Sequence, residues 1–193
     1  MSISASQVKE LRDRSGVGMM DCKKALQESN GDLDKAFDYL RKVGAAKAQK
    51  KEGRSTKEGS VISYIHPGSK LGVLVELNCE TDFVAKTEDF LQLGNDIAMH
   101  IAATGPLTVN VDEISKDVLD REKSIYLDQA KSSNKPENIV EKMVEGRIQK
   151  FYKENVLLEQ VFVKDPNKTI KDLVTSTIGK LGENIIISRF QRF

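Results

Sequence analysis

The sequence has few of the residues from which disulfide bridges, metal sites and many catalytic sites are built. It contains no tryptophan, two histidines and two cysteines in 193 residues. Cys22 and Cys79 stand far apart and outside any CxxC spacing, so they fit no disulfide framework. His66 and His100 are too few to complete a zinc cage with them. We therefore expect a reducing compartment and no bound metal.

Long apolar runs and an excess of one charge are also missing. No stretch of about eighteen residues is apolar and free of charge, so no membrane-spanning helix is expected. The first residues lack the apolar stretch of a secretory signal. Lys and Arg (30) nearly balance Asp and Glu (29), so no global field draws the chain to nucleic acid or an anionic membrane. The expected compartment is the cytoplasm.

Signatures of chemistry are absent too. No GxxxxGK[ST] loop is present, and Gly68-Ser69-Lys70 lies in a turn between two predicted strands, so we expect no direct nucleotide binding and no cofactor. Cys79 stands on the apolar phase of its strand, which favours a buried thiol over a histidine-activated nucleophile. The sequence therefore predicts a protein that is not an enzyme.

The chain as a whole is 39% hydrophobic, which is enough for a core, and its first 43 residues carry three helical patterns in succession. Ser4 begins the first with a capping box, and turn residues separate it from the next two. Asp32 can cap the third helix, and Gly44 suits its C-terminal end. One apolar stripe runs along this helix, formed by Leu33, Ala36, Phe37 and Leu40. Residues 1–43 are predicted to be a three-helix module.

A basic linker is predicted over residues 44–58. From Arg41 to Lys57, seven Lys or Arg residues stand against the single acid Glu52. The alanine-rich part, 45–50, favours a helix, which predicts a solvated helical tether. Phosphate contact with RNA or DNA is the alternative, but no aromatic residues are interleaved on which bases could stack. We favour the tether, so nucleic acid is not an expected partner.

The pattern over residues 59–193 predicts an α+β core. A β-rich run over 61–65, turn residues at 67–70 and strict alternation over 71–79 predict a β-hairpin. A final strand beginning at Ile185 is apolar on both faces and can pair with the hairpin. Helices are predicted from Thr87 and over 117–131, 137–155 and 169–180. The expected architecture is an antiparallel sheet of about three strands packed with helices.

The segment 79–85 joins the hairpin to the next helix, and its pattern allows two interpretations. Phe83 stands seven residues before Phe90 and fourteen before Ile97, so it can continue their stripe within one long helix. Thr87 followed by two acids is itself a helix start, which would leave Phe83 in a separate short turn. The pattern alone slightly favours the long helix.

The segment Thr81-Asp82-Phe83-Val84-Ala85 resembles the signature of the bacterial and organellar translation elongation factor Ts family. Other parts of the chain are similar to family segments in the same order: residues 15–26, 44–48, 135–147 and 157–160. Because these matches together extend over nearly the whole chain, the resemblance is far more specific than five residues alone.

The resemblance implies a guanine-nucleotide exchange factor of translation elongation. The N-terminal module would be a ubiquitin-associated-like domain that binds the GTPase elongation factor Tu. Phe83 would be a wedge that enters an apolar pocket of the GTPase and displaces a helix near its Mg²⁺ site, which loosens GDP. Asp82 would lie near the metal region, and Thr81 and Val84 would shape the corner.

The resemblance also suggests further contacts and an oligomeric state. Met19, Met20 and Lys23 are second-tier candidates for contact with the GTPase, although one methionine could equally pack inside the module. After Asp165 we expect the last helix and strand directly, without a coiled-coil insertion or a second core repeat. That is similar to the short family form and predicts a homodimer. A ubiquitin-binding adaptor, an RNA-binding accessory protein and a thiol enzyme are the alternatives.

Overall fold

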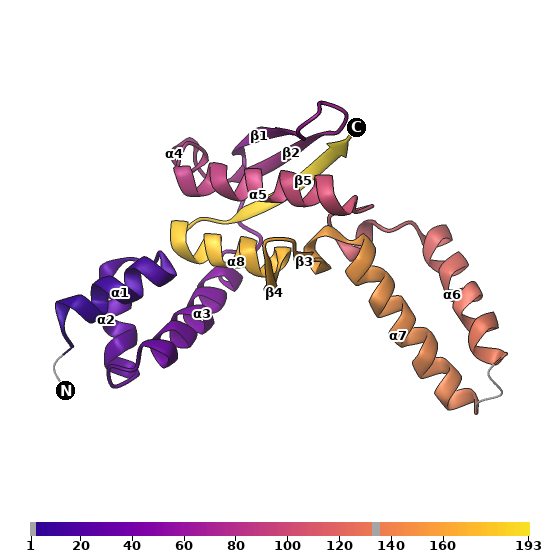
Figure 1. Ribbon diagram of the computed structural model, residues 1–193, viewed down its shortest axis with the longest axis horizontal. Helices are drawn as coiled ribbons and strands as arrows, with labels where there is room; N and C mark the ends of the chain where they lie inside the picture. Colours follow the sequence, from indigo (N-terminus) through magenta and orange to yellow (C-terminus); the bar gives the residue numbers. More distant parts are fainter. Residues whose placement is uncertain (1–2, 133–135) are drawn as a thin grey trace. The chain divides into compact units, whose positions relative to one another are not determined.

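The computed structural model describes residues 3–132 and 136–193 and has the expected α+β architecture (Figure 1). Lys135, which begins one of the family-like segments, lies outside the described residues. In chain order the elements are α1 (Ala5–Ser15), α2 (Met19–Glu28), α3 (Leu33–Gln49), β1 (Glu58–Ile65), β2 (Gly72–Cys79), α4 (Asp82–Ala85), α5 (Glu88–Thr104), η1 (Val111–Glu113), α6 (Lys116–Lys131), α7 (Glu137–Asn155), η2 (Leu157–Glu159), β3 (Val161–Phe162), β4 (Asp165–Thr169), α8 (Ile170–Leu181) and β5 (Ile185–Arg192). Within the described ranges, none of the helices has the length and apolar character that crossing a bilayer requires.

The chain packs as two compact units, each built from segments that are distant in sequence. The first unit comprises Met1–Val61, Glu76–Gly94 and Asp172–Ile186, and the second comprises Ile62–Val75, Asn95–Lys171 and Ile187–Phe193. Strands β1, β2 and β5 and helix α5 each contribute residues to both units.

The predicted three-helix module is confirmed by helices α1, α2 and α3 of the first unit. At the start of α1 the capping box is complete: Gln7 N–H donates to Ser4 Oγ, and Ser4 N–H donates to Gln7 Oε1. Asp32 caps α3 by accepting from two backbone N–H groups. The helices share one apolar core, formed by Val8, Leu11, Cys22, Ala25, Leu26, Ala36 and Leu40.

The prediction that α3 ends at Gly44 is wrong, because this helix continues to Gln49. A glycine that ends a helix usually adopts a left-handed conformation, whereas Gly44 keeps a helical one. Its small size has another use. A Cβ on Gly179 of α8 would lie 3.1 Å from the Gly44 Cα, so the two glycines allow α3 and α8 to approach closely.

The basic segment after the module is helical over 45–49, as predicted, but it is not a free tether. Lys47 forms an ion pair with Asp21 of α2 at 2.9 Å, and the Lys51 ammonium donates to the Gly182 carbonyl. Arg54 lies 3.5 Å from the Glu80 carboxylate. These contacts attach the segment to the rest of the first unit. The domain boundaries at 43 and 58 stay predictions.

The sheet has the order β1-β2-β5 and is antiparallel, as expected. Strand β2 buries the side chains of the predicted apolar phase, Val73, Val75, Leu77 and Cys79. In β5, Ile185 and Ile187 are buried and Ile186 is exposed, so this strand carries apolar side chains on both faces. Because β2 and β5 are antiparallel neighbours, the end of β2 lies beside the start of β5.

The second unit contains a long helical hairpin formed by α6 and α7, which run side by side in opposite directions (Figure 1). Helix α7 has the predicted bounds, and α6 begins one residue earlier than predicted. The hairpin lies before Asp165, so it is not an insertion at the point where we expected none. The short antiparallel pair β3 and β4 was not predicted. Two residues are too few to show a strand period, and Pro166 argues against one.

His100 of α5 joins a buried polar network in the second unit. Its Nδ1 accepts from Val163 N–H at 3.3 Å, so the proton sits on Nε2, which donates to Gln160 Oε1 at 2.9 Å. The Gln160 amide donates in turn to the Glu154 carbonyl at 2.7 Å. Burial lowers the pKa of His100, although the bond to Gln160 opposes that shift. The fold therefore requires the neutral imidazole.

Acid should destabilise the chain through His100. Below its ordinary pKa of 6.5 the unfolded His100 takes up a proton, whereas the folded one stays neutral down to its lowered pKa. The His100 contribution to stability is thus complete above about pH 6.5 and is lost as pH falls through that window. We expect the free energy of unfolding, measured in urea from pH 7 to pH 5, to fall less steeply for His100→Phe. An equal slope for the two proteins would contradict this assignment.

Candidate functional site: the corner at Thr81–Val84

The segment after β2 forms a short helix of its own, so the interpretation as one long helix is wrong. Helix α4 begins after Thr81, whose hydroxyl accepts from Val84 N–H at 3.4 Å. Thr87 separates α4 from α5: its hydroxyl donates to the Val84 carbonyl at 2.8 Å and accepts from Phe90 N–H at 3.3 Å. Two caps six residues apart thus divide what the apolar pattern alone would join.

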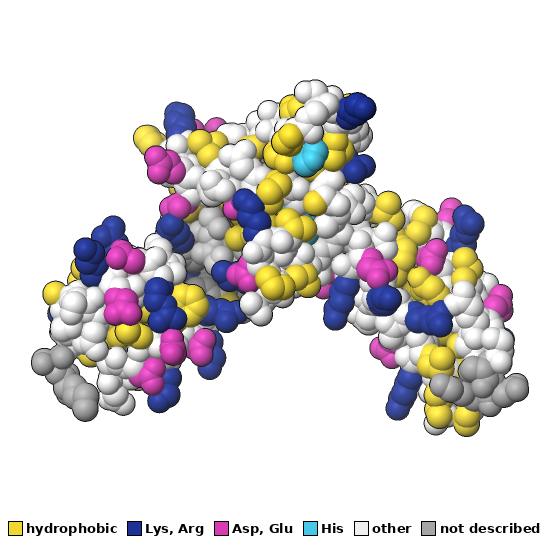
Figure 2. Space-filling model, viewed as in Figure 1, with side chains coloured by type: hydrophobic (Ala, Val, Ile, Leu, Met, Phe, Trp, Pro, Cys, Tyr) yellow, Lys and Arg dark blue, Asp and Glu magenta, His cyan; other side chains and the backbone are white. Residues whose placement is uncertain are grey.

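Phe83 consequently leaves the stripe formed by Phe90 and Ile97. Those two side chains are fully buried, whereas Phe83 is 79% exposed. In the space-filling view, a hydrophobic side chain and charged side chains of both signs lie together over α4 (Figure 2). The Phe83 ring is therefore exposed at the strand-to-helix corner.

The flanking residues of the corner have different environments. Asp82 is half-exposed and pairs with Lys86 one turn later, with 2.6 Å between carboxylate oxygen and ammonium nitrogen. The hydrogen bond from Lys86 is the main reason that the pKa of Asp82 is lowered, so the carboxylate stays charged beside Phe83. Val84 is half-buried and Ala85 is buried, which places the apolar anchor of α4 on the side opposite Phe83.

The corner is held by a glutamate about a hundred residues away in sequence. Glu183, between α8 and β5, accepts the Thr81 N–H at 2.9 Å and the Thr81 hydroxyl at 2.7 Å. Glu80 in turn accepts the Asn184 N–H at 2.7 Å, which is the main cause of its lowered pKa; the Arg54 charge adds to that shift. We missed Glu183 and Asn184 in the sequence, because no local pattern links them to residue 81.

Cys79 is fully buried at the end of β2, as predicted for a core thiol. Its Sγ–H donates to the Thr81 carbonyl at 3.1 Å. Burial raises the pKa of this thiol, and the negative charge of Glu183 raises it further. A thiol that stays protonated and buried is a poor nucleophile. The geometry therefore argues against the thiol-enzyme alternative.

Comparison with known proteins identifies the family to which the chain belongs. The family described as Elongation factor TS matches residues 40–177. Elongation factor Ts of Fervidobacterium nodosum is 59% identical over 192 residues, which cover all of this chain and 98% of the relative. The same-named protein of Syntrophobacter fumaroxidans is 55% identical over 193 residues, again with the whole chain and 96% of the relative covered. The chain belongs to the elongation factor Ts family.

The range matched by the elongation factor Ts family includes the corner but not the start of α2, where the second-tier candidates lie. Met19 is 43% exposed and Met20 78% exposed, and Lys23 is exposed as well. The core of the module contains Cys22, Ala25 and Leu26 of this helix instead. Neither methionine is buried, so the alternative that one of them packs inside the module is not supported.

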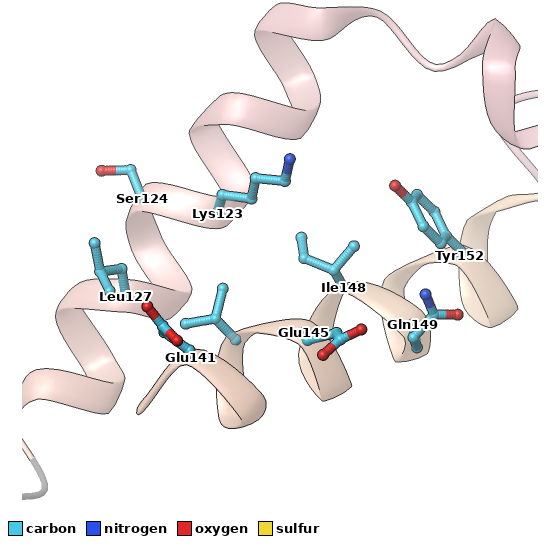
Figure 3. Close-up of a pocket in the computed structure, with 9 residues that line it drawn as sticks. Lys123, Ser124, Leu127, Glu141, Glu145, Ile148, Gln149 and Tyr152 are labelled. Carbon is cyan, nitrogen blue, oxygen red and sulfur yellow. The ribbon is translucent and has the colours of Figure 1, made fainter. Parts of the chain in front are cut away.

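A second surface feature of this elongation factor Ts family member is an open apolar hollow of about 530 Å³ between α6 and α7 (Figure 3). Ile148 points from α7 toward α6 in this hollow, and charged side chains lie at its rim. The lining residues are Lys123, Ser124, Leu127, Glu141, Val144, Glu145, Ile148, Gln149 and Tyr152. Over residues 3–132 and 136–193 no His, Cys, Asp and Glu side chains gather as a metal site.

The two phenylalanines of this region should differ sharply in their effect on stability. Phe90→Ala removes a fully buried ring and should lower the free energy of unfolding by about 3–5 kcal/mol. Phe83→Ala removes an exposed ring and should change it by less than about 0.5 kcal/mol. Chemical denaturation of the two variants beside the parent measures both. A large loss for Phe83→Ala would mean that this ring packs in the fold.

Proposed function

We propose that this protein is the guanine-nucleotide exchange factor of elongation factor Tu, acting in translation elongation in the cytoplasm. The observation that carries the proposal is the 79% exposure of Phe83 on a corner whose backbone is held by buried and half-buried neighbours. Membership of the elongation factor Ts family supports the same partner. The protein would act by binding rather than by chemistry, with no cofactor of its own.

Phe83 is the proposed wedge. Full burial of a phenylalanine side chain contributes about 1.5–3 kcal/mol, so insertion into an apolar pocket of the GTPase can drive a local rearrangement there. If the rearrangement displaces the Mg²⁺ that bridges the phosphates of GDP, the nucleotide loses part of its electrostatic hold. Linkage requires the reciprocal effect: GDP binding must weaken the grip of this protein.

The other corner residues have supporting roles in this proposal. Asp82, charged and beside Phe83, would lie near the metal region of the GTPase. Thr81 and Val84 would set the shape of the corner. Met19, Met20 and Lys23 would form a second contact on the three-helix module, where the flexible methionine side chains can adapt to a partner surface.

Release of labelled GDP from elongation factor Tu tests the wedge. We expect the parent to accelerate release and Phe83→Ala to be slower by about 10- to 100-fold, the range typical of a buried aromatic hot spot. Phe193→Ala is the matched control, because Phe193 is also a largely exposed phenylalanine, at 72%. No acceleration by the parent would refute the exchange function, and a fully active Phe83→Ala would refute the wedge alone.

GDP release measured over a range of factor concentrations separates the contribution of the three-helix module from that of the corner. Met20→Ala should raise the concentration of the factor that gives half-maximal release by a few fold, because an exposed side chain at an interface contributes mainly to binding. The maximal rate at saturation should stay near that of the parent, since the wedge is intact. A lower maximal rate with unchanged half-saturation would place Met20 in the exchange step itself.

We also propose that the protein forms a homodimer through the outer face of its sheet strands. Within the first unit, exposed apolar side chains occur on two of these strands: Val61 on β1 and Ile186 on β5. Sedimentation at micromolar concentration should give the dimer mass for the parent and the monomer mass for Ile186→Asp. Ile139→Asp, an equally exposed position on α7, should stay dimeric. A monomeric parent would contradict the proposal.

A further inference from the structure

Two glutamates tie the ends of β2 and β5 together by exchanging backbone hydrogen bonds. Glu183 accepts the N–H of Thr81, the residue after Glu80, at 2.9 Å. Glu80 accepts the N–H of Asn184, the residue after Glu183, at 2.7 Å. We call Glu80, Thr81, Glu183 and Asn184 the carboxylate brace. All four residues belong to the first unit.

Thr81 is the residue through which the brace reaches α4. Both of its donors, N–H and hydroxyl, go to the two oxygens of Glu183, and bonds to a carboxylate are stronger than bonds between neutral groups. The same hydroxyl oxygen accepts from Val84 N–H and so caps α4. The direction of the first turn of α4 is therefore set by the Glu183 carboxylate.

Helix α4 is held at this end by the brace and by a weaker bond, from the Cys79 thiol to the Thr81 carbonyl at 3.1 Å. It has four residues, far fewer than a helix needs to be stable by itself in water. Phe83 is too exposed to anchor the turn, so the position of its ring follows the backbone of α4. The remaining anchors, Ala85 and the Thr87 hydroxyl on the Val84 carbonyl, fix the far end of the helix.

The segment after α3 also contacts the brace. The Asn184 side chain is buried and donates to the Arg54 carbonyl at 3.0 Å, and Arg54 lies near Glu80. The Lys51 ammonium donates to the Gly182 carbonyl just before Glu183. The segment after α3 thus supports the loop that carries Glu183.

We propose that Glu183 is a positioning residue for nucleotide exchange, which orients Phe83 through Thr81. The inference rests on the proposed exchange function. Glu183 need not touch the GTPase: its carboxylate keeps α4 in the one orientation in which the Phe83 ring projects outward, so that the ring enters its pocket without a search among orientations.

A fluorescent reporter tests the orientation without any partner. Because the chain has no tryptophan, Phe83→Trp introduces a single indole at the tip. In this background Glu183→Ala should lower the time-resolved anisotropy of the indole, since the turn that carries it is released. Asp89→Ala is the matched control: it removes another carboxylate of the first unit, paired with Lys180 at 2.6 Å, and should leave the indole ordered.

Exchange is measured separately, with Phe83 in place. Glu183→Ala should slow the maximal release of labelled GDP from elongation factor Tu by about tenfold, short of the roughly 100-fold that a misplacement of about one ångström can cost. Thr81→Val removes the hydroxyl bond and should also be slow, and Thr81→Ser, which keeps that bond, should recover most of the loss. Asp89→Ala should match the parent.

The outcomes separate the two proposals. If the parent fails to accelerate GDP release, the exchange function is wrong, and the anisotropy still shows whether the brace orders the tip. If Glu183→Ala leaves either the anisotropy or the exchange rate unchanged, the positioning role is wrong. Thermal unfolding monitored by circular dichroism accompanies each variant. Should Glu183→Ala fail to fold, Thr81→Val against Thr81→Ser decides.

Discussion

The meeting of the end of β2 with the start of β5 is the constraint on which the proposed site depends. Sheet order makes these strands neighbours although about a hundred residues separate them. Their ends are then joined by Glu183 on Thr81 and by Glu80 on Asn184. A charged acceptor on a backbone N–H is a strong and directional contact. These two bonds hold the chain where β2 ends at Cys79 and α4 begins after Thr81, and they thereby determine where Phe83 lies.

The exposed Phe83 ring contributes no burial free energy to the fold. Phe90, seven residues later, supplies the apolar contact with the core that a phenylalanine usually makes. Nothing in the packing of the described residues needs a second ring at Phe83, and Thr87 interrupts the helix so that this ring cannot join the stripe. An aromatic residue held away from the core by two helix caps is typical of a recognition site rather than of a folding element.

Local signals predicted most of the fold, and long-range contacts account for the misses. The bounds of α7 and the alternation of β2 follow from residues within a few positions of one another, as do the caps at Ser4 and Asp32. Gly44 was misplaced as a helix end because its partner, Gly179, lies in α8. Glu183 was missed for the same reason. The pattern around Phe83 was ambiguous, and its resemblance to a family signature, rather than its periodicity, made it a candidate site residue.

Under the proposed function, the brace also explains how a tip of four residues could act on a partner. A flexible tip would lose conformational entropy when its ring became fixed in a pocket, and that loss would reduce the free energy available to displace the helix near the Mg²⁺. In this chain Thr81 is already held by two charge-assisted bonds, and Ala85 is already buried, so most of the ordering occurs during folding. If Phe83 is the wedge proposed above, its burial can then contribute almost fully to the nucleotide-poor state of the GTPase. Exchange by differential binding needs that difference, because tight binding to both states alone shifts no equilibrium.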